Sequence, residues 1–223
     1  MAFDQPIVIA TGNPHKIDEI RAVLAPIGVE VVGLSDLPGP FEEPIEGSES
    51  FEANATLKAI SYAEQTGRVC LADDSGLEVD ALSGAPGVIS SHYATDGEET
   101  GITREERDEA NNARLLADLE GVALESRSAR FVCTMVLAAP GIEELPARIL
   151  SIVRGAFEGR IGLPDDVPRG ANGFGYDPLV LVAPEFDRTG AELSAEEKNA
   201  RSHRGAAARL MAREIEHIRL QSE

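Results

Sequence analysis

The chain has 223 residues, of which 39 are acidic and 20 are lysine or arginine, so its formal net charge is −19. Hydrophobic residues make up 43% and charged residues 26% of the sequence, the composition of an ordinary globular protein. A charge this negative repels nucleic acid polymers and anionic membranes, so we exclude both as expected partners. A local group of basic residues can still bind a small phosphorylated ligand.

The start of the sequence, its apolar runs and its cysteines bear on the compartment in which we expect the protein. Residues 1–6 (MAFDQP) do not read as a secretory signal, and no apolar run is long enough to span a membrane, so we expect a cytoplasmic protein. Cys70 and Cys133 each lie in an apolar, strand-like run, which predicts buried free thiols rather than a disulfide or a metal site.

The first predicted strand, 6–10, runs through a glycine turn into a helix predicted at 14–25. Asn13 is a favourable N-cap, and Pro14 suits the first helical position. Lys16 then falls in the first helical turn, where the helix dipole disfavours a cation, so we expect an anion to compensate it. A strand, a glycine turn and a helix start also form a phosphate-binding cradle. The alternative is a lysine that extends into water.

An exposed acidic loop is predicted at 36–48, between a strand at 29–34 and a helix at 49–66 that Gly67 ends. Glu46 in this loop is a candidate metal ligand because it precedes a helix start. The alternative for Glu46 is a solvated surface charge.

The next predicted strand, 68–73, leads directly into two carboxylates, Asp73 and Asp74. Like charges close together at a strand end are costly unless a cation bridges them. Mg²⁺ takes oxygen ligands and needs only one or two carboxylates when a substrate supplies phosphates. The alternative is a plain turn, because Asp-Ser-Gly is ordinary turn chemistry.

The middle of the chain is predicted to contain a loop at 83–101 and a helix at 103–120. Two long strands, 130–139 and 148–161, are expected to form a hairpin, so part of the sheet is antiparallel. The remaining predicted elements are a strand at 179–182, a helix opened by the capping box SAEE at 194–197, and an amphipathic helix at 205–220. This order predicts a mixed-sheet α/β protein.

Two further motifs lie near the C-terminus. The segment 172–178 (NGFGYDP) surrounds Phe174 and Tyr176 with glycines, which let backbone approach a ligand, while an aromatic ring offers a face to a nucleobase. Rings that fill the core are the alternative. The segment 198–205 (KNARSHRG) gathers basic residues in an otherwise acidic chain, and a solvated helix face is its alternative.

In this order the motifs resemble those of the non-canonical purine nucleoside triphosphate pyrophosphatases, the inosine triphosphatase family. The resemblance covers residue 7 to about 210, and the blocks ADDSGLEVDAL and GFGYDP with the later KN and SHRG are its most specific parts. It implies a single domain over residues 1–223, with an elongated mixed β-sheet flanked by helices and a central substrate cleft between two lobes. It also implies a homodimer.

The resemblance assigns a role to individual residues. The phosphate-binding residues that it implies are Thr11, Gly12, Asn13, Pro14, His15, Lys16 and Lys58. Glu46 and Asp74 match ligands of Mg²⁺, Asp74 also matches the general base, and Ser75 lies beside it on the substrate. The residues matched to the base-binding pocket are Phe174, Gly175, Tyr176, Asp177, Lys198, His203 and Arg204.

The activity that the resemblance implies is Mg²⁺-dependent hydrolysis of ITP, dITP and XTP to the monophosphate and pyrophosphate, which removes these nucleotides from the cellular pool. Two alternatives stay open: a Maf-like nucleotide pyrophosphatase with another base preference, and a nucleotide-binding protein without catalysis. The chain departs from the family pattern at His92, which replaces an arginine, and at 162–167, which resembles an insertion.

Overall fold

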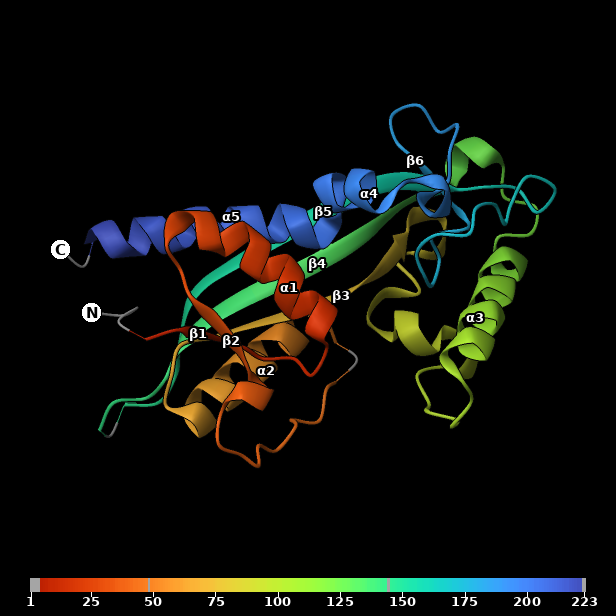
Figure 1. Cartoon of the computed structure of the whole chain (residues 1–223). Coiled ribbons are helices and arrows are strands. Elements are labelled where there is room, and N and C mark those ends of the chain that lie inside the picture. Colours follow the sequence, from red (N-terminus) through yellow and green to blue (C-terminus); the bar gives the residue numbers. More distant parts are fainter. Residues whose placement is uncertain (1–4, 48, 144, 222–223) are drawn as a thin grey trace. The chain divides into compact units, whose positions relative to one another are not determined.

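The computed structural model describes residues 5–47, 49–143 and 145–221, and this part of the chain forms a six-stranded mixed sheet (Figure 1). The strands are β1 (Ile7–Ile9), β2 (Val31–Gly33), β3 (Cys70–Val79), β4 (Ser128–Ala139), β5 (Arg148–Ile161) and β6 (Val180–Val182). The helices are α1 (Pro14–Leu24), α2 (Phe51–Thr66), α3 (Arg104–Asp118), α4 (Ala195–Arg201) and α5 (His203–Gln221).

The strand order is β2-β1-β3-β4-β5-β6. Strand β1 runs parallel to both β2 and β3, whereas β6 is antiparallel to β5. Parallel and antiparallel pairs therefore share one sheet, which confirms the predicted mixed α/β class.

The chain divides into two compact units, each built from separate stretches of sequence. Unit 1 comprises Met1–Ser75, Cys133–Gly155 and His203–Glu223, and unit 2 comprises Gly76–Val132 and Ala156–Ser202. Strands β3, β4 and β5 each contribute residues to both units. The single domain expected over 1–223 stays a prediction.

In unit 1 helices cover both faces of the strands. Ile7 and Ile9 of β1 pack with residues of α1 and α5, which lie side by side in Figure 1, while Val8 packs with the alanines of α2. Successive residues of a strand point to opposite faces, so the apolar run of β1 supplies both cores. The same alternation decides where the polar residues of β3 point.

Unit 2 has its own core, which contains Leu77 of β3, Leu115 of α3, Ile161 of β5 and Tyr176. Arg127 is buried there, and its guanidinium donates to the backbone carbonyls of residues 119, 122 and 162. Leu119 directly follows α3, so this arginine satisfies one carbonyl at the C-terminal end of that helix.

Several predicted boundaries differ from the structure. Strand β3 does not end at residue 73 but continues to Val79, so the interpretation of 73–76 as a turn is wrong. The predicted loop at 83–101 contains a 3-10 helix at Gly87–Thr95, and the last helix begins at His203 rather than 205. Residue 48 of the predicted acidic loop lies outside the described residues.

Other expectations are confirmed. Asn13 caps α1, Pro14 is its first residue, and Gly67 ends α2 with φ of 64°. Ser194 and Glu197 form the predicted capping box of α4. Cys70 and Cys133 are free and buried.

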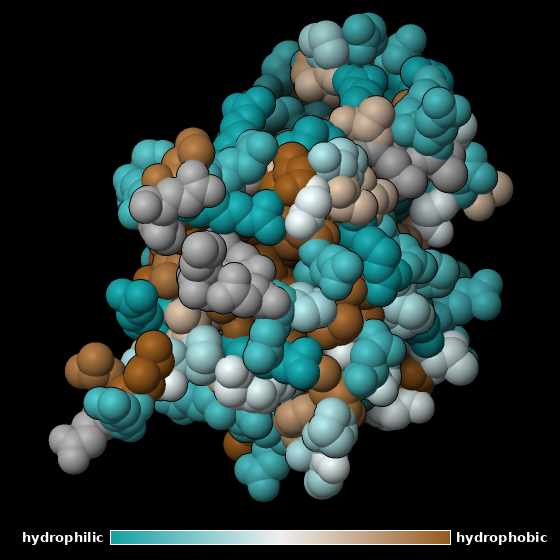
Figure 2. All heavy atoms as spheres, turned by 60° about the vertical axis from the view of Figure 1, so that its left-hand side comes forward, coloured by the Kyte–Doolittle hydropathy of each residue, from teal (hydrophilic) through white to brown (hydrophobic). Residues whose placement is uncertain are grey.

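The surface agrees with the composition. Hydrophilic residues cover most of the face seen in Figure 2, with hydrophobic residues lying among them. Within the described residues, no helix is both long enough and apolar enough to cross a membrane.

Gly155 of β5 allows α5 to approach the sheet of unit 1. A Cβ atom at this position would lie 2.3 Å from the backbone oxygen of His203 and 2.4 Å from the backbone nitrogen of Ala207. Only a residue without a side chain fits so close to the helix backbone. Gly155 therefore helps to place the start of α5, which carries Arg204.

We expect Gly155→Ala to lower the free energy of unfolding by about 1 to 3 kcal/mol, because the helix or the strand must shift to accept the methyl group. Denaturation in guanidinium chloride measures this change. Gly47→Ala is the matched control, since a Cβ there meets no heavy atom within 4 Å. Equal stability of the two variants would contradict the close approach of α5.

Candidate active site

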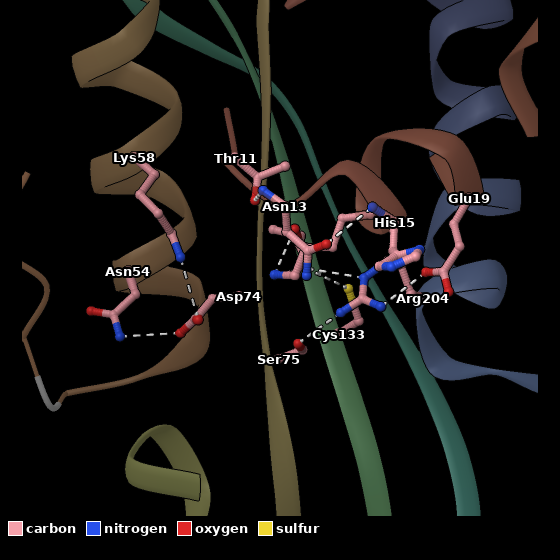
Figure 3. A network of polar contacts seen from close by, with 12 residues as sticks. Thr11, Asn13, His15, Glu19, Asn54, Lys58, Asp74, Ser75, Cys133 and Arg204 are labelled. Atoms are coloured by element: carbon pink, nitrogen blue, oxygen red, sulfur yellow. Dashed lines mark hydrogen bonds and ion pairs between the residues drawn. The ribbon is translucent and has the colours of Figure 1, made fainter. Parts of the chain in front are cut away.

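Asp73 and Asp74 are neighbours in β3 but point to opposite faces of the sheet in unit 1. Asp73 shares its face with Leu71 and the core under α1 and α5, and Asp74 shares the other face with Cys70, Ala72 and the core under α2. In Figure 3, Asp74 points toward α2, and Arg204 lies on the other side of β3. The expectation that one cation bridges both carboxylates is therefore wrong, because they lie within a continuous strand and not at its end.

On the first face, Asp73 is an almost fully buried carboxylate between two cations. Its side chain is 1% exposed, and its oxygens lie 3.1 and 3.0 Å from Nζ of Lys16 and 3.3 Å from Nε of Arg204. Burial alone would raise the pKa of Asp73, but Lys16 and Arg204 outweigh it and hold that pKa well below its usual range. The anion expected near Lys16 is thus supplied by the protein itself.

Arg204 connects three elements of unit 1. Besides Asp73, its guanidinium donates through Nη1 to Oε2 of Glu19 at 2.9 Å and through Nη2 to Oγ of Ser75 at 3.3 Å (Figure 3). Each of its three nitrogens therefore has a partner on α1 or β3. This geometry favours a role in holding Asp73, and the expected contact of Arg204 with a nucleobase stays a prediction.

On the second face, Lys58 of α2 lies between two carboxylates. Its Nζ is 3.1 Å from Oε2 of Glu46 and 3.4 Å from Oδ1 of Asp74. Asn54, one helical turn earlier, donates to Oδ2 of Asp74 at 3.1 Å and accepts from the backbone nitrogen of Gly47 at 3.1 Å. Asn54 therefore connects the acidic loop to Asp74, and Figure 3 shows its contact with Asp74.

At this second face one ammonium, that of Lys58, lies between two carboxylates. Burial by itself would lower the pKa of the Lys58 ammonium, but Asp74, Glu46 and Asp73 together raise it above its usual value. Burial also raises the pKa of Asp74, in spite of Lys58 and Asn54. The two carboxylates outnumber the single ammonium of Lys58, so negative charge remains, and their oxygens are donors that suit a divalent cation. Within the described residues no three acidic, histidine or cysteine side chains gather as a metal site, so ligands from a substrate would have to complete the coordination.

The predicted phosphate loop is accessible and ordered by its own side chains. Residues 12 to 15 are exposed at the start of α1. Oγ1 of Thr11 accepts from the backbone nitrogen of Asn13 at 3.2 Å, and Oδ1 of Asn13 accepts from that of His15 at 3.0 Å. The loop thus presents a helix N-terminus beside Lys16, the arrangement that favours an anion.

In unit 2 the two aromatic rings of the segment 172–178 separate into different environments. Tyr176 is 4% exposed and donates its hydroxyl to the backbone oxygen of Ser90 at 2.7 Å, so its ring fills the core. Phe174 is 57% exposed, and Nζ of Lys198 lies 4.8 Å from its ring centroid. Asp177 is buried and pairs with both Lys198 and the backbone nitrogen of Phe174. Of these two rings, only that of Phe174 is exposed.

The predicted site residues therefore fall into groups in different units. The phosphate loop, Glu46, Lys58, Asp74, Ser75, His203 and Arg204 belong to unit 1, and residues 174–177 and Lys198 belong to unit 2. Sequence reasoning missed Asn54 and Glu19. Their signal was helical spacing, since Asn54 lies four residues before Lys58 and Glu19 three residues after Lys16.

Asp73→Asn should lower the free energy of unfolding by about 3 to 5 kcal/mol, because Lys16 and Arg204 then lose the charge that compensates them. A double-mutant cycle with Lys16→Met, followed by chemical denaturation, isolates the part due to this pair. We expect the double variant to lose less stability than the sum of the two single variants. Additive losses would show that Lys16 and Asp73 do not interact.

The chain matches known proteins along almost its whole length. Residues 7–214 match the model of the Ham1 family. A dITP/XTP pyrophosphatase from an Exiguobacterium species is 48% identical over 209 residues, which are 94% of this chain and 96% of that protein. A dITP/XTP pyrophosphatase from Nitratidesulfovibrio vulgaris is 46% identical over 203 residues, covering 91% and 92% of the two chains.

Solved structures of similar proteins also match this chain. The Ham1 protein of Staphylococcus aureus has a TM-score of 0.77 at 37% identity and covers 96% of this chain and 99% of its own. A nucleoside-triphosphatase, or dITP/XTP pyrophosphatase, from Mycobacterium abscessus has a TM-score of 0.70 at 42% identity, with 93% and 98% covered. Together with the family model, these relatives show that the chain belongs to the Ham1 family.

Proposed function

We propose that this protein hydrolyses the non-canonical purine nucleotides ITP, dITP and XTP to the monophosphate and pyrophosphate, and so removes them from the nucleotide pool. Relatives named dITP/XTP pyrophosphatase, 46 to 48% identical over more than 90% of both chains, support this activity. Family membership favours it over a Maf-like enzyme. In the structure, the observation that carries the proposal is Lys58 held between Glu46 and Asp74, an arrangement suited to a metal-bound polyphosphate.

Glu46 and Asp74 are the residues that would hold the metal, which we propose to be Mg²⁺. When bound, the ion supplies positive charge to phosphate oxygens, where negative charge develops as the phosphoanhydride breaks. Two carboxylates, with phosphate oxygens as further ligands, match the preference of Mg²⁺ for few protein ligands.

Asp74 is the proposed general base. Water attacks the α-phosphorus, the bond to the bridging oxygen of the β-phosphate breaks, and pyrophosphate leaves, while Asp74 takes the proton of the attacking water. Burial raises the pKa of Asp74, which makes it a better proton acceptor than a carboxylate in water. Asn54 donates to Oδ2 of Asp74 and so orients this carboxylate.

The lysines and the helix start act on the phosphates. Lys16 and the loop from Thr11 to His15 would bind the leaving pyrophosphate. The ammonium of Lys58 would contact phosphate oxygens in place of the carboxylates of Glu46 and Asp74. Ser75 would contact the substrate beside Asp74. Because Asp73 is ionised and buried, it holds Lys16 in place at the start of α1.

Phe174 is the proposed stacking surface for the nucleobase, with Gly175 allowing close approach and Tyr176 and Asp177 supporting the loop. Lys198, Arg204 and His203 each offer at least one hydrogen-bond donor. Hypoxanthine and xanthine carry an acceptor oxygen at C6, whereas adenine carries a donor amino group, so binding by hydrogen-bond donors selects the 6-oxo bases. We also propose that the protein is a homodimer and that it is located in the cytoplasm.

A panel of nucleotides tests the function. With Mg²⁺ present, we expect kcat/KM for ITP, dITP and XTP to exceed that for ATP by about a hundredfold to ten-thousandfold, since buried donors left unpaired by adenine discriminate strongly. The product assay must detect pyrophosphate and not single phosphates. Preference for pyrimidine nucleotides would favour the Maf-like alternative, and nucleotide binding without turnover would favour a non-catalytic protein.

Asp74→Asn tests the proposed base. We expect kcat for ITP to fall at least about a hundredfold, the usual scale for a lost general base, while ITP binding measured by calorimetry survives. Asp80→Asn is the matched control, because Asp80 directly follows β3 and pairs on the surface with Arg130. Near-normal turnover of Asp74→Asn would remove Asp74 from this role.

A further inference from the structure

Three residues of α3 contact the segment 172–178 within unit 2. Arg104, Asp108 and Asn112 follow one another at intervals of four residues, so they lie along one face of the helix. We refer to these three residues as the α3 stripe. The resemblance of the sequence to a known family assigned no role to any of them.

Two members of the α3 stripe bind the backbone of Gly175. Its nitrogen donates to Oδ2 of Asp108 at 2.9 Å, and its oxygen accepts from Nδ2 of Asn112 at 3.1 Å. Gly175 has φ of 60°, in the left-handed region that favours glycine. Both polar backbone groups of this residue are thus held by side chains of α3, one helical turn apart.

The third member, Arg104, lies on the ring that precedes Gly175. Its Cζ is 4.6 Å from the ring centroid of Phe174, within the range of a cation–π interaction. Its ion pair with Asp108 is long, at 3.9 Å, and its side chain is 60% exposed. A cation in the first turn of a helix is disfavoured by the helix dipole, so the helix itself does not account for an arginine here.

The three contacts converge on two consecutive residues, Phe174 and Gly175. A chance surface contact would involve one arginine and one ring. Here the nitrogen and the oxygen of Gly175, next to the ring, are also hydrogen-bonded by side chains of α3. An exposed phenylalanine loses rotamer freedom when a ligand stacks on it, and holding the ring beforehand reduces that loss. The stripe therefore acts on the orientation of the aromatic ring.

We propose that the α3 stripe positions Phe174 for stacking by a purine base. Asp108 and Asn112 fix the backbone at Gly175, and Arg104 holds the ring. This inference rests on the proposed function, in which Phe174 binds the nucleobase. Because Arg104 contacts the ring and not the edge of a base, its loss weakens all purine ligands alike and leaves the ratio of ITP to ATP activity unchanged.

The test compares two ligands, IMP, which carries a base, and pyrophosphate, which does not. In Arg104→Met and Asn112→Ala we expect the Kd of IMP to rise about threefold to tenfold, the scale of a lost cation–π contact or a lost hydrogen bond, respectively. The Kd of pyrophosphate should stay within about twofold. Arg114→Met is the matched control, because Arg114 belongs to the same helix but stacks on Tyr93, with its Cζ 5.2 Å from that ring. It should leave IMP binding unchanged.

Phe174→Ala separates this inference from the proposed function. If Phe174→Ala weakens IMP but the stripe variants do not, the stripe has no positioning role and the proposed function stands. If Phe174→Ala has no effect on IMP, the stacking role of Phe174 and the inference both fail. A parallel loss of IMP and pyrophosphate binding in the stripe variants would indicate a general folding defect and would also overturn the inference.

A spectroscopic measurement needs no ligand. The chain contains no tryptophan, so Phe174→Trp introduces a single tryptophan at the ring position, which can be excited apart from the three tyrosines. In this background we expect Arg104→Met to lower the fluorescence anisotropy and shift the emission to longer wavelength, because the ring becomes more mobile and more hydrated. Identical spectra with and without Arg104 would show that this arginine does not hold the ring.

Discussion

The buried charge of Asp73 is the constraint on which unit 1 depends. An ionised carboxylate with a 1% exposed side chain costs several kcal/mol unless cations and hydrogen bonds compensate it. Lys16 comes from α1 and Arg204 from α5, so compensation of this one charge joins two helices to β3. Gly155 contributes by letting the backbone of α5 come close to β5.

Placing Asp73 on one face of the sheet also places its neighbour on the other. Asp74 must then point toward α2, where Lys58 and Asn54 meet it. The two consecutive carboxylates consequently have different tasks: Asp73 is held ionised by two cations, while burial raises the pKa of Asp74. A group that stays charged suits a structural ion pair, and a group with a raised pKa suits proton transfer.

In unit 2 a similar separation occurs between two aromatic residues. The hydroxyl of Tyr176 donates to a backbone oxygen inside the core, and its ring is buried, whereas the ring of Phe174 is exposed. Burial of Tyr176 and Asp177 anchors the segment, so an exposed ring can be held in a defined place. The α3 stripe adds contacts to Gly175 from outside this anchor.

The sequence by itself determined the local features of this protein and the family to which it belongs. The N-cap at Asn13, the end of α2 at Gly67 and the capping box at Ser194 depend on a few neighbouring residues, so they were predictable. The order of strands and helices followed from hydrophobic periodicity for the same reason. The motif blocks were specific enough to identify the family.

Only the tertiary structure decided where the charged groups meet. Lys16 is 57 positions and Arg204 131 positions from Asp73, and no local pattern specifies such pairs. The sequence suggested that Asp73 and Asp74 share a cation at a strand end. In the structure β3 continues to Val79, so the two carboxylates point to opposite faces, and cations from two distant helices compensate the buried charge of Asp73.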